Sequence, residues 1–165
     1  MLLSSLCLAK SFTLSVGVEN PGNFDNGYEV DSNPRVDLEY LNHEKTFAFG
    51  IGGGINYVNV DKENYLLLTS ISLNSAVNIV NNEVYKVYAG LNLIYPYPFV
   101  TVYHVDNNIV SIHPSFSHEL KVGVYYNDFN ASLGLSTIYL KKAYSNTETT
   151  DKINRLSVNV GYLLF

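Results

Sequence analysis

The stretch FNASLGLSTIY, residues 129–139, alternates strictly between two kinds of side chain over most of its length. One set is apolar and comprises Phe129, Ala131, Leu133, Leu135 and Tyr139. The other is small or polar and comprises Asn130, Ser132, Gly134 and Ser136. A period of two predicts a β-strand with one apolar face. Both ends of that face carry an aromatic residue, and the two aromatics lie ten positions apart.

The same ten-residue spacing between aromatics recurs in three other alternating segments. The further pairs are Phe47 and Tyr57, Tyr85 and Tyr95, and Phe116 and Tyr126. Ten extended residues span roughly 33 Å, or about 25 Å along a barrel axis at a strand tilt of about 40°. This is about the height of the lipid-facing band of a membrane β-barrel, which aromatic girdles bound on both sides. We therefore predict two girdles, formed by Tyr40, Phe47, Tyr57, Tyr85, Tyr95, Phe116, Tyr126, Phe129, Tyr139 and Tyr162.

Eight alternating segments predict an all-β fold, an eight-stranded antiparallel up-and-down transmembrane β-barrel. The expected strands are 11–19, 35–42, 46–58, 65–79, 84–95, 109–126, 129–140 and 153–165. No Asp, Glu, Lys or Arg occupies the apolar face of any of them. Lipid explains this exclusion, because a lysine or arginine at the bilayer midplane costs about 2–4 kcal/mol. The opposite face is small or polar and is expected to line the lumen.

Charged residues on the lumen face predict a cluster inside the barrel. Its expected members are Asp37, Glu39, Lys86, Glu119, Lys121 and Arg155. Charges in a narrow barrel must pair or be solvated. We interpret the cluster as an ion-pair plug that closes the pore; an ion path or gate is the alternative.

The connections between the expected strands alternate in length, which orients the barrel. The long or medium ones are 20–34, 59–64, 96–108 and 141–152, and the short ones are 43–45, 80–83 and 127–128. Short turns face the periplasm in small outer-membrane barrels, so both termini are expected there. Residues 99–105 and 109–113 also alternate, around a turn at 106–108, and predict a hairpin beyond the membrane. A ten-stranded barrel is the competing interpretation.

Composition limits the remaining possibilities. The 165 residues suit one domain, and no run of 18 or more apolar residues predicts a membrane helix. A net charge of −5 argues against nucleic acid as a partner. The only cysteine, Cys7, lies in a short apolar run, so residues 1–9 are expected to be the remnant of a secretory signal and 10–165 the barrel domain. Lipidation of Cys7 is the less favoured alternative, because Leu6 precedes it.

Over residues 10–165 the chain resembles the small eight-stranded outer-membrane barrels of the OmpA membrane domain, OmpX and OmpW type. The sharpest element is the last strand, 156–165, which ends in GYLLF. The resemblance implies a place in the bacterial outer membrane, contact with outer-membrane lipids, and recognition by the barrel-assembly machinery. The assembly signal would be formed by Tyr162, Leu164 and Phe165.

The sequence favours a non-enzymatic, monomeric surface protein that needs no cofactor. An extracellular or host ligand would meet the long connections, where Tyr97, Phe99 and Tyr103 are the expected contacts. Three alternatives stay open: a narrow channel for small solutes, a soluble lipocalin-like barrel, and a lipid A hydrolase. The hydrolase hypothesis rests on the His-x-Ser spacing of His113 and Ser115, which those enzymes share. The histidines lie singly, so no metal site is expected.

Overall fold

A computed structural model describes residues 9–21, 33–44, 46–59, 65–82, 84–98, 102–105, 108–113, 115–144 and 147–164. These residues form ten β-strands. The strands are β1 (Ala9–Pro21), β2 (Asn33–His43), β3 (Phe47–Asn59), β4 (Tyr65–Asn81), β5 (Tyr85–Pro98), β6 (Val102–Val105), β7 (Asn108–His113), β8 (Ser117–Tyr126), β9 (Phe129–Tyr144) and β10 (Thr147–Leu163). Within these ranges, no helix has the length and apolar character needed to cross a membrane.

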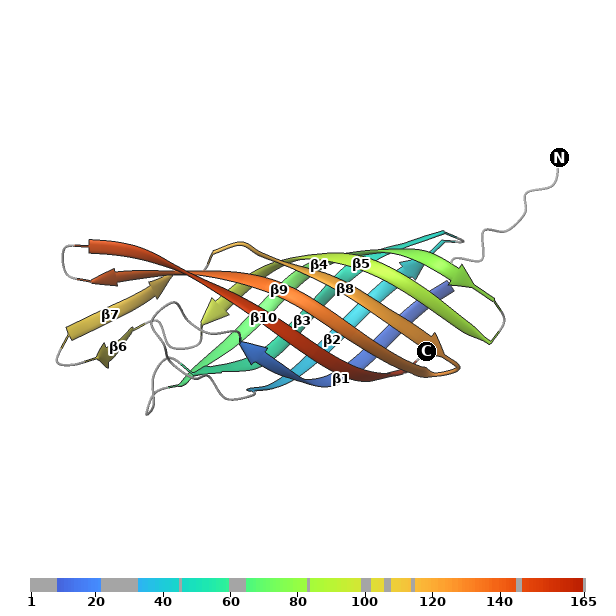
Figure 1. Ribbon diagram of the computed structural model, residues 1–165, viewed down its shortest axis with the longest axis horizontal. Coiled ribbons are helices and arrows are strands. Elements are labelled where there is room, and N and C mark those ends of the chain that lie inside the picture. Colours follow the sequence, from blue (N-terminus) through green and yellow to red (C-terminus); the bar gives the residue numbers. More distant parts are fainter. Residues whose placement is uncertain are drawn as a thin grey trace.

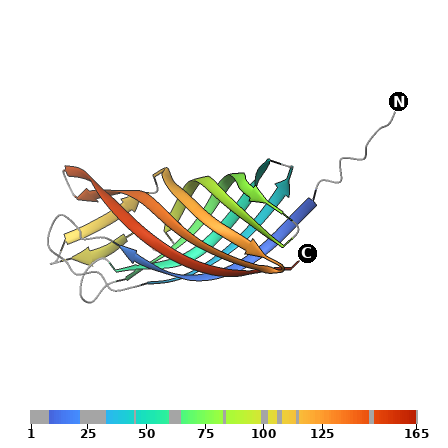
Figure 2. The same cartoon turned by 45° about the vertical axis from the view of Figure 1, so that its right-hand side comes forward.

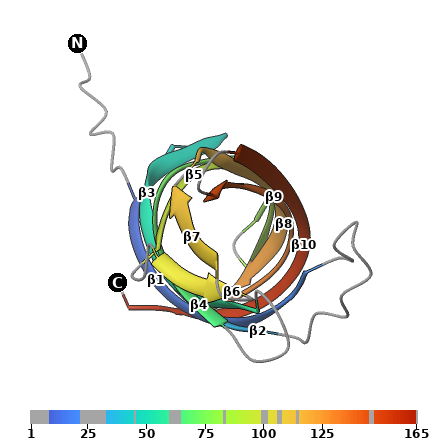
Figure 3. The same cartoon turned by 90° about the vertical axis from the view of Figure 1, so that its left-hand side faces the viewer.

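Eight of the strands close into an antiparallel barrel (Figures 1 and 3). Their order around the ring is β1-β2-β3-β4-β5-β8-β9-β10, and β10 pairs with both β9 and β1. The shear of the barrel is found by stepping from each residue to the one paired with it on the next strand. The path starts at Asn33 on β2 and passes through β1 and around the ring. The path returns to β2 at His43, so the shear is 43 − 33 = 10 residues. A shear of this kind accompanies strand tilts of roughly 35–45°. The prediction of an eight-stranded antiparallel barrel is confirmed.

β6 and β7 form the additional hairpin expected outside the barrel wall. They pair antiparallel, and β7 continues onto the far part of β9. Figure 1 shows the hairpin beyond one end of the barrel, and Figure 3 shows it lying across the outline of that end. β5 pairs directly with β8, so the ten-stranded alternative is wrong. A single strand over 109–126 is also wrong, because β7 ends at His113 and the wall strand β8 begins only at Ser117.

The β9–β10 hairpin is longer than the sequence pattern indicated. A loose connection over 141–152 is wrong, because paired strand continues to Tyr144 and resumes at Thr147. The two strands project together past the rim of the barrel (Figure 2). In this ladder the backbone of Thr149 pairs with Lys142 and that of Thr150 with Lys141, and β-branched residues such as threonine suit extended backbone.

Apolar side chains on the barrel strands point away from the axis. Along the middle of each strand they are about half exposed, as at Val16 (60%), Ile71 (70%) and Leu135 (62%). The interior holds the buried polar side chains, so the soluble lipocalin-like alternative, with its apolar face inward, is wrong. The interior is less uniformly polar than predicted: Leu41, Leu68, Ile94 and Ile138 are also buried there.

Candidate functional site

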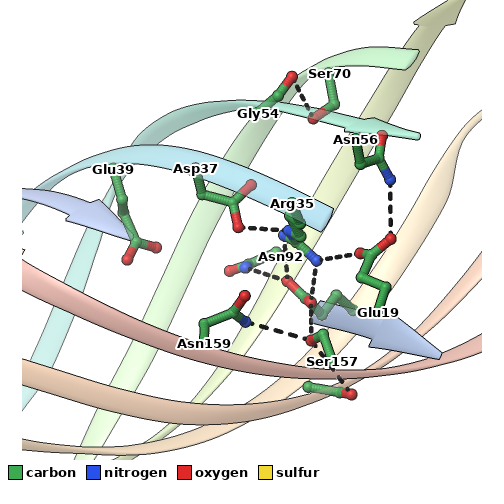
Figure 4. A network of polar contacts seen from close by, with 12 residues as sticks. Glu19, Arg35, Asp37, Glu39, Gly54, Asn56, Ser70, Asn92, Ser157 and Asn159 are labelled. Atoms are coloured by element: carbon green, nitrogen blue, oxygen red, sulfur yellow. Dashed lines mark hydrogen bonds and ion pairs between the residues drawn. The ribbon is translucent and has the colours of Figure 1, made fainter. Parts of the chain in front are cut away.

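The guanidinium of Arg35, near the start of β2, is the centre of a polar network inside the barrel (Figure 4). Nη1 donates to Glu19 Oε1 at 2.7 Å and to Glu119 Oε1 at 2.8 Å, and Nη2 donates to Glu119 Oε2 at 3.3 Å. Nε donates to Asp37, two residues along the same strand face. One cation therefore contacts three carboxylates, which come from β1, β2 and β8.

Glu119 and Glu19 are the two most buried of the described carboxylates. Besides Arg35, other neutral and charged side chains donate hydrogen bonds to their oxygens or pair with them. Glu119 is fully buried, and its carboxylate accepts from Asn92 Nδ2 at 2.9 Å and from Ser157 Oγ at 3.2 Å. Glu19 is 1% exposed and accepts from Asn56 Nδ2 at 2.9 Å. Arg155 on β10 forms a second ion pair with Glu19. A buried charge is tolerated when its hydrogen-bonding positions are filled in this way.

A second, smaller cluster lies beside the first. Lys121 Nζ donates to Glu39 Oε2 at 3.3 Å, and Asn74 Nδ2 donates to Glu39 Oε1 at 2.8 Å. Together the two clusters hold four acids, Glu19, Asp37, Glu39 and Glu119, and three bases, Arg35, Lys121 and Arg155. Their charges nearly balance, which is the condition for burying them in one compartment.

Inward glycines leave the space that the long charged side chains need. A Cβ at Gly134 would lie 2.6 Å from Glu119 Oε1 and 2.5 Å from Ser157 Oγ. A Cβ at Gly54 would lie 2.2 Å from Asp37 Oδ1. The small residues of the alternating pattern therefore set where the carboxylates can lie.

Gly134→Val is expected to lower the free energy of unfolding by about 1–3 kcal/mol, because the added carbons displace Glu119 from its donors. The matched control is Ala131→Val, which adds the same kind of bulk on the exposed face of the same strand and should have little effect. Urea unfolding of the refolded protein, followed by circular dichroism, measures both. Equal stability of the two variants would show that Glu119 is not held in a tightly packed site.

An aromatic layer lies on the side of the clusters toward the short turns. Tyr88 and Tyr125 are buried, with ring centroids 4.9 Å apart, and His43 meets Tyr125 edge-on at 5.9 Å. Asn130 Nδ2 donates to Tyr88 Oη at 3.1 Å. These rings lie inside the barrel between the charged clusters and the short-turn end.

Five of the six residues predicted for the lumen cluster are in these contacts: Asp37, Glu39, Glu119, Lys121 and Arg155. Lys86 lies apart, in the wall of a cavity at the short-turn end. The sequence prediction omitted Arg35, the most connected base, and Glu19, the acid that pairs with both Arg35 and Arg155. Both have the inward phase of their strands, so extending the alternation to the strand ends would have found them.

The ten predicted girdle residues all lie on the outer face of the wall strands or immediately before one. Some contact each other across strands: Tyr95 and Phe116 have ring centroids 5.3 Å apart, and Phe129 and Tyr162 meet at 5.5 Å. Their role as membrane anchors stays a prediction.

Other predicted positions are described only in part. Tyr97 is 56% exposed on the outer face of β5, and Tyr162 and Leu164 point outward at the end of β10. Phe99 and Phe165 lie outside the described residues. For Tyr103 and His113 only the strand positions are described, and Ser115 lies between β7 and β8. Within the described ranges, no group of three or more histidine, cysteine or acidic side chains could hold a metal ion.

Solved structures with the same architecture include small outer-membrane barrels. Neisserial surface protein A is 15% identical, with a TM-score of 0.60, over 93% of this chain and 96% of that chain. OprG from Pseudomonas aeruginosa is 12% identical, with a TM-score of 0.57, over 95% and 97%. Ail, the attachment invasion locus protein of Yersinia pestis, is 14% identical, with a TM-score of 0.50, over 94% and 97%. No family model and no curated protein matches the sequence. The chain has the fold of the small eight-stranded outer-membrane barrels.

Proposed function

We propose that this protein is an integral barrel of a bacterial outer membrane that conducts no solute and holds its long hairpins on the cell surface. The observation that carries the proposal is the contrast between an apolar exterior and a charged, paired interior. An apolar exterior of this kind is not expected of a water-soluble barrel. A lumen filled with ion pairs is not expected of a wide channel.

The exterior is suited to lipid. Between the aromatic residues at the two rims, no described outward side chain is Asp, Glu, Lys or Arg. The few outward hydroxyl groups form hydrogen bonds within the wall: Ser75 Oγ donates to the Leu91 carbonyl and Thr69 Oγ1 to the Tyr97 carbonyl, both at 2.9 Å. In hydrocarbon an unsatisfied polar group costs several kcal/mol, so such internal bonding favours a lipid-facing surface.

The interior supports a closed lumen. Two cavities lie among the charged residues, and each is only about 20 Å³. A space of this size holds about one water molecule. The Arg35 network and the Tyr88–Tyr125 pair lie one beyond the other along the axis, so a solute crossing the barrel would have to displace both.

The proposed orientation places the short turns in the periplasm. β1 begins and β10 ends at this end of the barrel, and the β6–β7 and β9–β10 hairpins extend from the other (Figure 1). The hairpins are then available to an external partner, with Tyr97 near their base. Lys141 and Lys152 are exposed on the outer face of the β9–β10 hairpin, and Tyr139 pairs with Lys152. These lysines would lie at the level of the lipid phosphates just above the girdle.

Conductance in a planar lipid bilayer tests the closed lumen. The refolded protein is expected to give no steady single-channel steps. The variant Arg35→Ala/Glu119→Ala/Tyr88→Ala/Tyr125→Ala removes both the centre of the charged network and the aromatic pair, and it is expected to give steady steps. Leu133→Ala, on the outer face, should stay silent as a control.

Steady steps from the unaltered protein would overturn the closed barrel and favour the narrow solute channel. Membrane insertion is tested separately, by cell fractionation and by migration on a gel before and after heating. A protein that stays in the soluble fraction would contradict the outer-membrane assignment. An enzyme would require His113→Ala to abolish a change in lipid A that the unaltered protein causes; we expect no such change.

A further inference from the structure

A cavity of about 170 Å³ opens at the short-turn end of the barrel. Its wall combines the first residues of β1, the last residue of β10, and the turns between β4 and β5 and between β8 and β9. It is much larger than the cavities among the buried ion pairs. The ring of Tyr125, which packs against Tyr88, is part of the wall and separates the cavity from the charged clusters. The cavity therefore faces the periplasm in the proposed orientation, with Tyr125 on its inner side.

Among the described residues, the wall of the cavity carries two positive charges and no acid. Lys10 and Lys86 both line the cavity, and no aspartate or glutamate does. Neither lysine forms an ion pair with a carboxylate among the residues that the structure describes. Of the described acids in the neighbouring turns, Glu44 and Asp128 are exposed and lie outside this wall, while Glu83 of the β4–β5 turn lies outside the described residues. The charges of the described wall residues thus favour an anion.

Ser11 and His43, which also line the cavity, form a hydrogen bond in which either side chain can be the donor. Ser11 Oγ and His43 Nε2 are 2.7 Å apart. If Ser11 donates, the imidazole hydrogen is on Nδ1, which is buried and has no hydrogen-bond partner among the described residues. If Nε2 donates, the hydroxyl hydrogen of Ser11 is the one left over. In either arrangement, one of these two hydrogens has no hydrogen-bond acceptor among the described residues.

The rest of the wall is largely apolar, with Val84, Tyr85, Tyr125 and Leu163 in it. A dry cavity of about 150 Å³ can hold a benzene molecule. The size of this cavity thus suits one six-membered ring or a short branched chain together with a charged group. We propose that the short-turn mouth binds a small organic carboxylate, with its apolar part against these side chains and its carboxylate between Lys10 and Lys86.

Titration of the refolded, isotope-labelled protein in detergent micelles with benzoate tests this site. Amide resonances of Lys10, Lys86 and Asn127 are expected to shift together and to saturate. Benzamide is the neutral compound of the same shape. Its affinity should be lower than that of benzoate by at least about tenfold, because it cannot form a charge-assisted hydrogen bond. Inorganic phosphate, which has no apolar part, should also bind more weakly than benzoate.

Lys86→Gln is expected to weaken benzoate binding about tenfold, as the loss of one charge-assisted contact predicts. Lys152→Gln, an exposed lysine on the opposite hairpin, should leave the affinity unchanged. If Lys86→Gln does not refold, Lys10→Gln makes the same comparison. Equal binding of benzoate and benzamide, shifts spread over the lipid-facing residues, or an affinity that neither lysine alters would each overturn the proposal. A phosphate affinity as high as that of benzoate would overturn the assigned ligand class. The conductance result does not enter this test, so the site and the closed lumen can fail separately.

Discussion

Arg35→Met is expected to lower the free energy of unfolding by about 3–5 kcal/mol, the usual cost of removing one partner from a buried ion pair. Arg35 is the only described cation that contacts Glu119, and it also contacts Glu19 and Asp37. Without it, Glu119 is a fully buried carboxylate held only by neutral donors. Urea unfolding in lipid vesicles measures the loss. It is followed by circular dichroism, because the chain has no tryptophan for a fluorescence measurement.

Two companion variants show whether the loss comes from charge. The double variant Arg35→Met/Glu119→Gln should be more stable than the sum of the two single changes predicts, because it removes the uncompensated charge together with its partner. Lys152→Met, which removes an exposed lysine, should stay within about 0.5 kcal/mol of the unaltered protein. If Arg35→Met were as mild as Lys152→Met, the network would not be a stabilising feature of the lumen.

Leu133→Arg is expected to lower the stability of the lipid-embedded barrel by about 2–4 kcal/mol. Leu133 is 56% exposed and lies near the midpoint between Phe129 and Tyr139, so the arginine would enter the centre of the bilayer. In a water-soluble protein the same change at an exposed leucine would be nearly neutral, within about 0.5 kcal/mol. The size of the effect therefore separates the two environments directly.

Thr150→Arg is the matched control for the arginine itself. Thr150 is exposed on the outward phase of β10, in the part that extends past the rim. An arginine near the interface costs only about 0–1 kcal/mol. If Leu133→Arg and Thr150→Arg unfold at the same urea concentration in vesicles, Leu133 does not face hydrocarbon and the membrane proposal is wrong.

The sequence predicted the wall of this protein more successfully than its ends. Alternation over segments such as 129–139 identified strands and the side each residue faces, because a strand places successive side chains on opposite faces. It was less reliable at the boundaries. A strand predicted over 109–126 is interrupted before Ser117, and a loop predicted over 141–152 is mostly paired strand. These segments extend beyond the barrel wall, where burial no longer imposes a fixed alternation.

The candidate sites show the same division. Parity alone placed Glu119 and Lys121 inside the barrel, but it could not pair them. Glu119 contacts Arg35, 84 positions away, and Lys121 contacts Glu39, 82 positions away. Lys86 has the same inward phase, yet it lies with Lys10 at the short-turn cavity. The tilt and shear of the strands decide which inward residues reach the same level of the lumen, and neither quantity can be read from the period of one strand.

The sequence by itself determined that this chain is an eight-stranded barrel with an apolar, charge-free outer face, since a period of two and the cost of charge in lipid act on each strand locally. Only the tertiary structure decided how the interior is organised. It brought Glu19 and Arg35 to the centre of the ion-pair network and placed Lys10 and Lys86 in the wall of one cavity at the short-turn end. These features depend on a register shared by eight strands, because charges far apart in sequence become neighbours only when the barrel closes.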